Sequence, residues 1–483
     1  MTVVIGVDVA TADVRATAVD PAGSVVATAA RPLPPPVRPR PGWSEQPARY
    51  AEVAFEVLRA VAERLAGRPV AGLAVTSTSG TVVPCGTEGV PRGDALLYDD
   101  RRAERNGGPA PAADELPAAL GRIVWLERHR PAPRYLHVAD VVVAALAGEI
   151  QPTDGSHALK AGADPESLEW PRQLLTRLGV GPGTLPALER PGVVVAGVSA
   201  AAAARTGLPE AVPVVLGMTD GCTGQIAAGA VRVGDAVSVL GTTLVVKAVT
   251  QARPRATDSA VYSHRAPDGR WWPGGASNVG AGVLGPASSG ADPAGTDLAA
   301  LDLAAGRHGP AAVCCYPLTR RGERFPFARP DAEGFWTGEP RDAVERHRAL
   351  LEGVAFTERL ALTVLGRAGG LADDGPLRAV GGASRSDVWL RIRATVTGRS
   401  VSVPEHPTSG FGAAVLAAAA TVHGSLAAAV AAMVRPARTV DPDEAEREAL
   451  EASYGRFLAG LREHGYLAGD DEAPRSGGAG RQG

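Results

Sequence analysis

Short apolar runs rich in β-branched residues recur along the chain, punctuated by glycine, and they limit its possible folds most strongly. They lie at Val3–Val9, Val14–Val19, Gly72–Thr76, Val212–Leu216, Ala236–Leu240, Leu244–Val249 and Leu377–Val380. Segments rich in alanine and leucine alternate with these runs, as helices alternate with buried strands. The sequence therefore predicts an α/β protein.

Length and a restart of the strand pattern predict two domains. A chain of 483 residues exceeds the size of one ordinary hydrophobic core. A glycine-rich segment ends near residues 228–234, and a new strand, turn and strand follow. We therefore predict one domain over residues 1–228 and a second over 229–467, with a proline-rich surface excursion at 30–41. Residues 468–483 are small, polar and glycine-rich, and we expect them to be disordered.

Charge and cysteine usage exclude several classes of protein. The formal net charge is -3 and 21% of residues are charged, so nothing indicates a nucleic-acid partner. Almost all basic residues are arginine, with lysine only at 160 and 247, as GC-rich codon usage would produce. Cys85, Cys222, Cys314 and Cys315 have neither CxxC nor zinc-finger spacing. This usage indicates neither a metal cage nor a disulfide framework and favours a reducing cytoplasm.

Two apolar segments need to be distinguished from targeting or membrane sequences. Val3–Val9 has no basic region before it and is interrupted by Asp8, so it predicts a buried first strand instead of a signal peptide. The alanine-rich stretch Phe411–Val434 is broken by polar residues and glycine between 421 and 425. Core helices separated by a turn explain this stretch better than a membrane span.

The first strand brings Asp8 to a tight turn that leads into a second strand. A strand–turn–strand hairpin that gathers backbone N–H groups, a hydroxyl and a carboxylate can hold a phosphate and its metal. An ordinary turn residue is the alternative interpretation of Asp8 when this segment is taken alone.

A second hairpin with the same pattern begins the second predicted domain. It contains Gly241, Thr242 and Thr243 between two apolar runs. In actin-like and hexokinase-like ATPases, two related domains each offer such a phosphate hairpin. Neither lysine lies in a P-loop sequence, and the GxGxxG match at Gly280–Gly285 follows no clear strand, so we interpret it as an unrelated glycine-rich loop.

Asp220 follows the apolar run Val214–Leu216 and precedes a helix rich in glycine and alanine. A carboxylate at this place can accept the proton of an alcohol that attacks the γ-phosphorus of ATP. A helix N-cap is the alternative role, and the two roles are compatible.

The segment Gly381–Trp389 is a glycine turn that opens a helix after a strand. Glycine allows a base or ribose to approach the backbone closely, and a helix N-terminus favours polar ligand groups. A plain turn between a strand and a helix is the alternative.

Taken together and in this order, these segments resemble the FGGY family of carbohydrate kinases from about Val3 to Ala420. Other stretches are similar to one branch of the family, the D-ribulose kinases of plants and cyanobacteria. These stretches are Thr78–Val83, Ala95–Arg102, His137–Asp140, Asp154–Asp164, Ser238–Lys247, Val261–Arg265, Gly274–Asn278, Tyr316–Leu318 and Gly322–Phe327.

The resemblance implies the two-domain fold of hexokinase, Hsp70 and actin, with ribonuclease H-like domains and ATP–Mg²⁺ in an interdomain cleft. It implies that Asp220 is the catalytic base, that Asp8 organises Mg²⁺ and approaches the sugar, and that Thr11 acts at the first phosphate turn. The residues that it implies at the phosphates are Ala12, Gly241, Thr242 and Thr243. Those that it implies at the adenosine are Gly381, Gly382, Ser386 and Trp389. Ser79 and Asp100 are implied at the sugar.

Several positions depart from the family pattern. Ala10 stands where the family usually has glycine, and Ala12 and Asp13 stand where it often has glycine or a small hydroxyl residue. An inward-pointing Asp13 would weaken ATP binding unless Arg15 and Mg²⁺ offset its charge. Positions 99 and 386 carry Asp and Ser where the family has asparagine.

The expected reaction is D-ribulose plus ATP giving D-ribulose 5-phosphate plus ADP. The same chemistry on D-xylulose, L-ribulose, a pentitol or glycerol is the nearest alternative, because a few polar side chains select the sugar. A non-catalytic sensor of nucleotide or sugar is the alternative from a different functional class. An actin-like filament protein is a further alternative, which is disfavoured because it would leave the sugar-side segments without a role. We expect a cytoplasmic monomer or homodimer that binds a small sugar and ATP, with no membrane or nucleic-acid partner.

Overall fold

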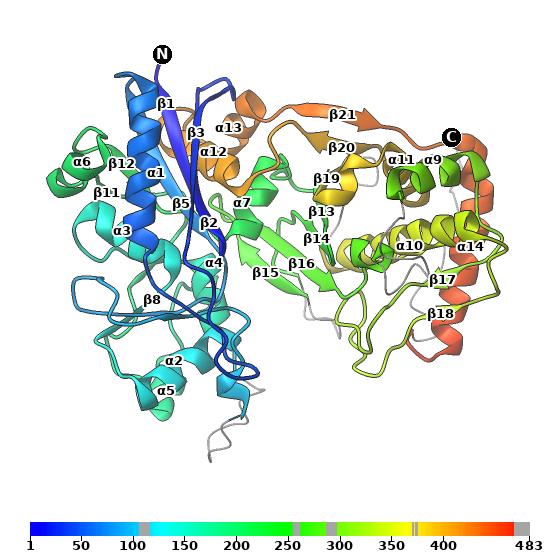
Figure 1. The fold of residues 1–483 in the computed structure, drawn as a ribbon, viewed down its shortest axis with the longest axis horizontal. Coiled ribbons are helices and arrows are strands. Elements are labelled where there is room, and N and C mark those ends of the chain that lie inside the picture. Colours follow the sequence, from blue (N-terminus) through cyan, green and yellow to red (C-terminus); the bar gives the residue numbers. More distant parts are fainter. Residues whose placement is uncertain (106–115, 255–260, 286–296, 370, 372–374, 468–483) are drawn as a thin grey trace, which may run out of the picture.

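Two mixed β-sheets with helices packed against them form two lobes, side by side in Figure 1. The computed structural model describes residues 1–105, 116–254, 261–285, 297–369, 371 and 375–467. The predicted disordered tail, 468–483, lies outside the described residues. The predicted α/β class is confirmed, and the predicted strand runs all appear as strands.

The first lobe is built on a six-stranded sheet with the order β11-β12-β5-β1-β2-β3. Its strands are β1 (Val3–Val9), β2 (Asp13–Val19), β3 (Val25–Pro32), β5 (Val70–Ser77), β11 (Val194–Gly197) and β12 (Pro213–Val215). Every residue of β1 is buried, because the strand lies in the middle of the sheet. Helices α1 (Tyr50–Leu65), α3 (Val138–Ala147) and α6 (Ala200–Thr206) cover one face.

Shorter elements extend the first lobe below this sheet in Figure 1. They are β4 (Glu45–Gln46), β6 (Val83–Cys85), β7 (Ala95–Leu96), β8 (Arg134–Leu136), β9 (Thr153–Asp154), β10 (Leu188–Glu189), α2 (Ala118–His129), α4 (Gly155–Ala158), α5 (Arg172–Leu178) and the 3₁₀ turns η1 (Arg102–Arg105) and η3 (Leu159–Ala161). The guanidinium of Arg102 lies 3.8 Å from the ring centre of Trp43 and 4.6 Å from that of Trp125. This stacking joins the extension into one core.

The second lobe contains a seven-stranded sheet with the order β15-β16-β14-β13-β19-β20-β21. Its strands are β13 (Ala236–Leu240), β14 (Leu244–Ala248), β15 (Tyr262–Arg265), β16 (Trp271–Ser277), β19 (Leu377–Val380), β20 (Val401–Pro404) and β21 (Pro436–Val440). The other elements are α9 (Leu298–His308), α10 (Ala343–Gly369), α11 (Asp387–Thr397), α14 (Glu444–Glu463), β17 (Cys315–Tyr316), β18 (Phe335–Trp336), η4 (Ala281–Leu284) and η5 (Gly382–Arg385).

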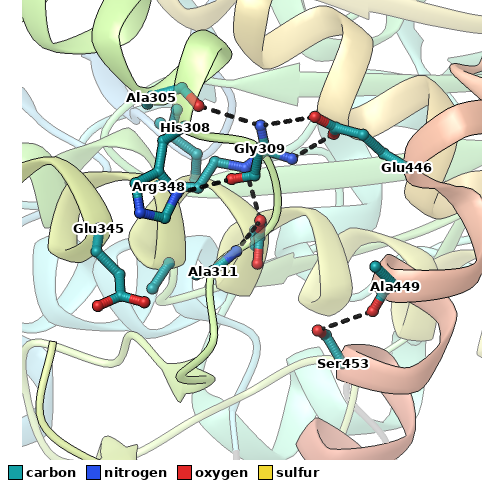
Figure 2. Close-up of polar contacts among 12 residues, drawn as sticks. Ala305, His308, Gly309, Ala311, Glu345, Arg348, Glu446, Ala449 and Ser453 are labelled. Carbon is teal, nitrogen blue, oxygen red and sulfur yellow. Dashed lines mark hydrogen bonds and ion pairs between the residues drawn. The ribbon is translucent and has the colours of Figure 1, made fainter. Parts of the chain in front are cut away.

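A buried ion network joins three of the second lobe's helices (Figure 2). Arg348 on α10 is 1% exposed and donates to Glu352 on the same helix at 2.6 Å. It also donates to the carbonyl oxygen of Ala305 on α9 and to Glu446 on α14, at 3.3 and 2.5 Å. Because every arm of the guanidinium has a partner, its charge is compensated within the core.

Helices α12 (Ser409–Thr421) and α13 (Leu426–Met433) come late in the chain, yet α12 packs on β1, β5 and α7 (Asp220–Ala227), elements of the first lobe. Figure 1 shows both helices in the upper part of the first lobe. A Cβ atom at Gly412 would lie 1.8 Å from the carbonyl oxygen of Thr223, so only glycine allows this approach to α7. The prediction of core helices separated by a turn over Phe411–Val434 is confirmed. No helix in the described ranges is long and apolar enough to cross a membrane.

Candidate active site

The turn between β1 and β2, residues 10–12, is held by two neighbouring segments. The side chain amide of Gln46 donates to the carbonyl oxygen of Thr11 at 2.7 Å. The backbone N–H of Leu33 donates to the carbonyl oxygen of Ala12 at 2.9 Å. These bonds fix one conformation of the turn immediately after the Asp8 strand.

The turn between β13 and β14, residues 241–243, is held in the same way. The backbone N–H groups of Ala281 and Gly282 donate to the carbonyl oxygens of Gly241 and Thr242, at 2.8 and 3.1 Å. The donors belong to the GxGxxG segment, which forms η4 instead of the long helix of a dinucleotide-binding motif. That segment therefore supports the second hairpin.

Our prediction that no strand precedes the GxGxxG segment is wrong, because β16 ends three residues before it. Two glycines hid the strand from the pattern of β-branched residues. At Gly274 a Cβ atom would lie 2.7 Å from Cγ of Lys247, and at Gly275 it would lie 2.3 Å from the ring of Phe325. The strand needs glycine because other side chains cross it closely.

Asp220 is the first residue of α7, directly after the N-cap residue Thr219. Asp220 is therefore not the N-cap of this helix, because that position belongs to Thr219. The backbone N–H of Gly221 donates to Oδ1 of Asp220 at 2.6 Å. Burial raises the pKa of Asp220, while this hydrogen bond and the charges of Lys247 and His157 lower it in part.

Asp8 and Asp220 influence each other electrostatically although they are far apart in the sequence. Asp8 is 7% exposed. Burial, followed by the negative charge of Asp220, raises the pKa of Asp8 from 3.8 to about 6. Two carboxylates in one partly desolvated place are typical of a catalytic or metal-binding site.

The backbone around Asp220 is held from within the first lobe. Thr76 on β5 donates to the carbonyl oxygen of Met218 at 2.7 Å, and Ser409 on α12 donates to that of Asp220 at 3.1 Å. The backbone N–H of Thr219 donates to the hydroxyl of Ser156 on α4 at 2.9 Å. These contacts fix the orientation of the helix that carries the carboxylate.

Behind Ser156 lies a buried chain of polar side chains. Nε2 of His157 is 3.0 Å from Oγ of Ser77, and Nδ1 is 2.5 Å from Asp154. Burial raises the pKa of Asp154, but the charge of His157 and the bonds from His157 and Ser156 outweigh it, so that this pKa is about 2. The stretch Asp154–Asp164, identified through the family resemblance, thus supports the site.

The two sugar-side residues predicted from the sequence differ in their surroundings. Ser79 follows β5, near the end of β1, and its buried hydroxyl has no partner among the described residues. The carboxylate of Asp100 is fully buried, and it accepts from Arg102 at 2.7 Å and from the backbone of Ser44 at 2.6 Å. In this structure the carboxylate of Asp100 therefore holds together segments of the first lobe, and its oxygens bond to Arg102 and Ser44.

The residues predicted at the adenosine also differ in their surroundings. Gly381 packs against the end of β13, where a Cβ atom would lie 2.5 Å from the carbonyl oxygen of Leu240, so the glycine turn with Gly382 adjoins the second hairpin. Ser386 caps α11, its Oγ accepting from the backbone N–H of Trp389 at 3.1 Å. The indole of Trp389 is 2% exposed and donates to the carbonyl oxygen of Leu351 at 3.1 Å, so it packs in the core of the second lobe.

The two lysines of the chain lie in stretches that resemble the D-ribulose kinases, but no role was predicted for either. Nζ of Lys247, on β14, donates to the carbonyl oxygen of Gly221 at 2.7 Å. Nζ of Lys160, on η3, lies 4.3 Å from the ring centre of Tyr262 on β15. Both side chains therefore lie where the lobes meet. Their signal was their rarity, because every other basic side chain apart from histidine is arginine.

Comparison with known proteins gives a consistent result. Residues 236–421 match the C-terminal domain of the FGGY family of carbohydrate kinases. A xylulose kinase from Staphylococcus epidermidis is 23% identical over 97% of this chain and 98% of its own.

Two solved structures share the fold. The xylulose kinase from Rhodospirillum rubrum, at 27% identity, has a TM-score of 0.81 over 95% of this chain and 98% of its own. Glycerol kinase from Plasmodium falciparum with ADP, at 16% identity, has a TM-score of 0.82 over 95% and 98%. The predicted hexokinase- and actin-like fold is confirmed. Residues 236–421 therefore carry the C-terminal domain of the FGGY family of carbohydrate kinases, and the chain as a whole is similar in fold to xylulose and glycerol kinases.

Proposed function

We propose that this kinase phosphorylates a ketopentose, with D-ribulose as the preferred substrate and D-ribulose 5-phosphate as the product. The observation that carries the proposal is the shared site of Asp8 and Asp220, in which burial raises the pKa of both carboxylates and the negative charge of Asp220 raises that of Asp8 further. The β1–β2 hairpin lies beside this site, and strand β14 links the site to the β13–β14 hairpin.

In the proposed reaction Asp220 is the base. Its carboxylate takes the proton from the attacking sugar hydroxyl, whose oxygen forms a bond to the γ-phosphorus while the bond from that phosphorus to the β–γ bridging oxygen breaks. ADP leaves with the bridging oxygen. A half-buried carboxylate with a raised pKa suits this task because it accepts a proton more readily than a fully hydrated one.

The hairpins would hold the phosphates from both sides. Thr11 and Ala12 belong to the first turn, and Gly241, Thr242 and Thr243 to the second. Both turns are fixed by hydrogen bonds to their carbonyl oxygens, so they need little reorganisation when phosphate binds. Gly381 and Gly382, which adjoin the second turn, and Ser386, which caps α11, would border the adenosine.

Mg²⁺ fits the donors present if ATP supplies most of its ligands. No group of three or more His, Cys, Asp or Glu side chains in the described ranges could hold a metal alone. Mg²⁺ is commonly held by one or two carboxylates together with substrate phosphates and water. Asp8 would hold the ion, which would neutralise charge on the transferred phosphoryl group.

D-Ribulose is supported by the segments that resemble its kinases. Two of them, Thr78–Val83 and Asp154–Asp164, flank the site, and the first contains the unpartnered hydroxyl of Ser79. A sugar hydroxyl would satisfy that group. D-Xylulose is the second candidate, favoured by the xylulose kinases among the relatives.

A coupled ADP-release assay tests the proposal. The panel contains D-ribulose, D-xylulose, L-ribulose, a pentitol, glycerol and gluconate, each with Mg²⁺–ATP. We expect the highest kcat/KM on D-ribulose. A clear preference for D-xylulose would replace the substrate and keep the mechanism, whereas no turnover on any compound would contradict the proposal.

A further inference from the structure

Among the described residues, four hydrogen bonds link the backbone from Met218 to Gly221 to side chains of elements other than α7, and one of them differs from the rest. Three come from Thr76, Ser156 and Ser409, which belong to elements packed in the first lobe. The fourth comes from Lys247 in the sheet of the second lobe, and it is the one made by a charged side chain.

Burying the charged ammonium of Lys247 costs free energy, and no paired carboxylate among the described residues offsets that cost. The side chain is 3% exposed. Its Nζ contacts a neutral carbonyl oxygen at 2.7 Å and the sulfur of Cys222 at 3.8 Å, and it forms no ion pair within the described part of the chain. A buried ammonium without a directly paired carboxylate is expensive. Gly274 makes room for its stem, because a Cβ atom there would lie 2.7 Å from Cγ of Lys247.

The contact reaches the candidate base through a single residue. The carbonyl oxygen of Gly221 accepts from Lys247 at 2.7 Å, while the backbone N–H of Gly221 donates to Oδ1 of Asp220 at 2.6 Å. Holding this glycine therefore also holds the hydrogen bond that orients the carboxylate. The charged groups that act on Asp220 from other elements are Asp8, His157 and Lys247.

The strand that carries Lys247 also begins at the second phosphate turn. β14 starts at Leu244, directly after Thr243, and its pairing with both β13 and β16 makes it rigid. The four residue-to-residue steps from Thr243 to Lys247 span about 13 Å of extended chain. One strand thus sets the separation between the turn that would hold phosphate and the helix that carries the base.

We propose that Lys247 is a positioning residue, which ties the first turn of α7 to the second lobe and so aligns Asp220 with the phosphoryl group held by the β13–β14 turn. This inference rests on the proposed role of Asp220 as base. Lys247 acts through Gly221 and takes no part in bond formation.

The test compares Lys247→Met with Lys160→Met, in the assay with the best sugar of the panel. Methionine keeps much of the apolar stem and removes the ammonium in both variants, but only the first loses the bond to Gly221. We expect Lys247→Met to lower kcat by at least about tenfold with KM for ATP and sugar within about threefold, because misalignment affects the chemical step. Lys160→Met should lower kcat much less.

Gly221→Ala provides a second test that keeps the charge. A Cβ atom at this position would lie 3.2 Å from Nζ of Lys247 and would push the ammonium away, while alanine favours the helix. Its kcat should fall in the same direction by a smaller factor. If Lys247→Met does not fold, as judged by thermal unfolding, Gly221→Ala alone decides.

An unchanged kcat in the deciding variant would overturn the inference, as would equal losses in the two lysine variants or a loss confined to KM. Asp220→Asn is measured alongside. If it retains turnover, the proposed base is wrong; if it is inactive while Lys247→Met is fully active, only the positioning role fails.

Discussion

The hairpin of the first lobe and the hairpin of the second share one backbone design and differ in their charge. In each, hydrogen bonds from neighbouring segments reach two carbonyl oxygens of the turn. The first turn lies between Asp8 and Asp13, both acidic, whereas the second contains Gly241 and two threonines and leads to Lys247. Under the proposed function, both copies of this element would contact phosphate, and the first would also bring the carboxylate of Asp8 to the metal.

The largest expected difference between the hairpins comes from removing one group in each. Under the proposed function, Asp8→Asn removes the charge that would face the metal and the reacting phosphoryl group, so kcat should fall by at least about a hundredfold. Thr243→Val loses one hydroxyl and should raise KM for ATP by about tenfold or less. Steady-state kinetics measure both. A loss of kcat in Thr243→Val as large as that in Asp8→Asn would break the comparison.

Asp8→Asn should also stabilise the folded protein in the absence of Mg²⁺. A carboxyl whose pKa rises from 3.8 to about 6 on folding destabilises the protein fully above pH 6, and this cost disappears below pH 3.8. The variant should therefore raise the free energy of unfolding by up to about 3 kcal/mol at about pH 7.5, and by much less at about pH 4. Urea denaturation at the two pH values checks this. Equal stabilisation at both would contradict the cause assigned to the shift.

A smaller effect is expected from Gly280→Ala, which disturbs only the second hairpin. The added Cβ atom would lie 2.5 Å from the carbonyl oxygen of Thr242 and 2.5 Å from Cα of Thr243. The turn must move, so KM for ATP should rise by about tenfold. Gly455→Ala on α14 is the matched control, since nothing lies within 4 Å of its new Cβ atom. If both variants bind ATP like the parent, η4 does not support the turn.

The smallest effect is expected at Asp13, the departure from the family pattern that raised doubt about ATP binding. Its carboxylate pairs with Arg15 at 2.9 Å, on a half-exposed side of the hairpin. An ion pair of this kind contributes little, so Asp13→Asn should change KM for ATP by less than about threefold. A fall of about tenfold or more would show that this charge repels the phosphates.

The elements defined by local pattern were predictable, and those defined by packing across the molecule were not. Both hairpins and Asp220 could be found because strand runs and turn glycines are local signals. The placement of α12 on the first sheet depends on Gly412, whose role is visible only once α7 lies against it. Trp389 was assigned to the ligand from its motif, but the direction of a side chain on α11 is decided by the core. Lys247 ends a stretch that resembles the D-ribulose kinases, but its contact with Gly221 depends on how α7 packs against β14.

The most direct test of the central claim is the comparison of Asp220→Asn with the parent, at saturating ATP and the best sugar. Asparagine keeps the shape of the side chain and cannot accept the proton. If Asp220 is the base, kcat falls by about 10²- to 10⁴-fold while KM for ATP changes little. A variant that keeps kcat within about threefold of the parent would contradict the assignment of Asp220 as the base and, with it, this account of the site.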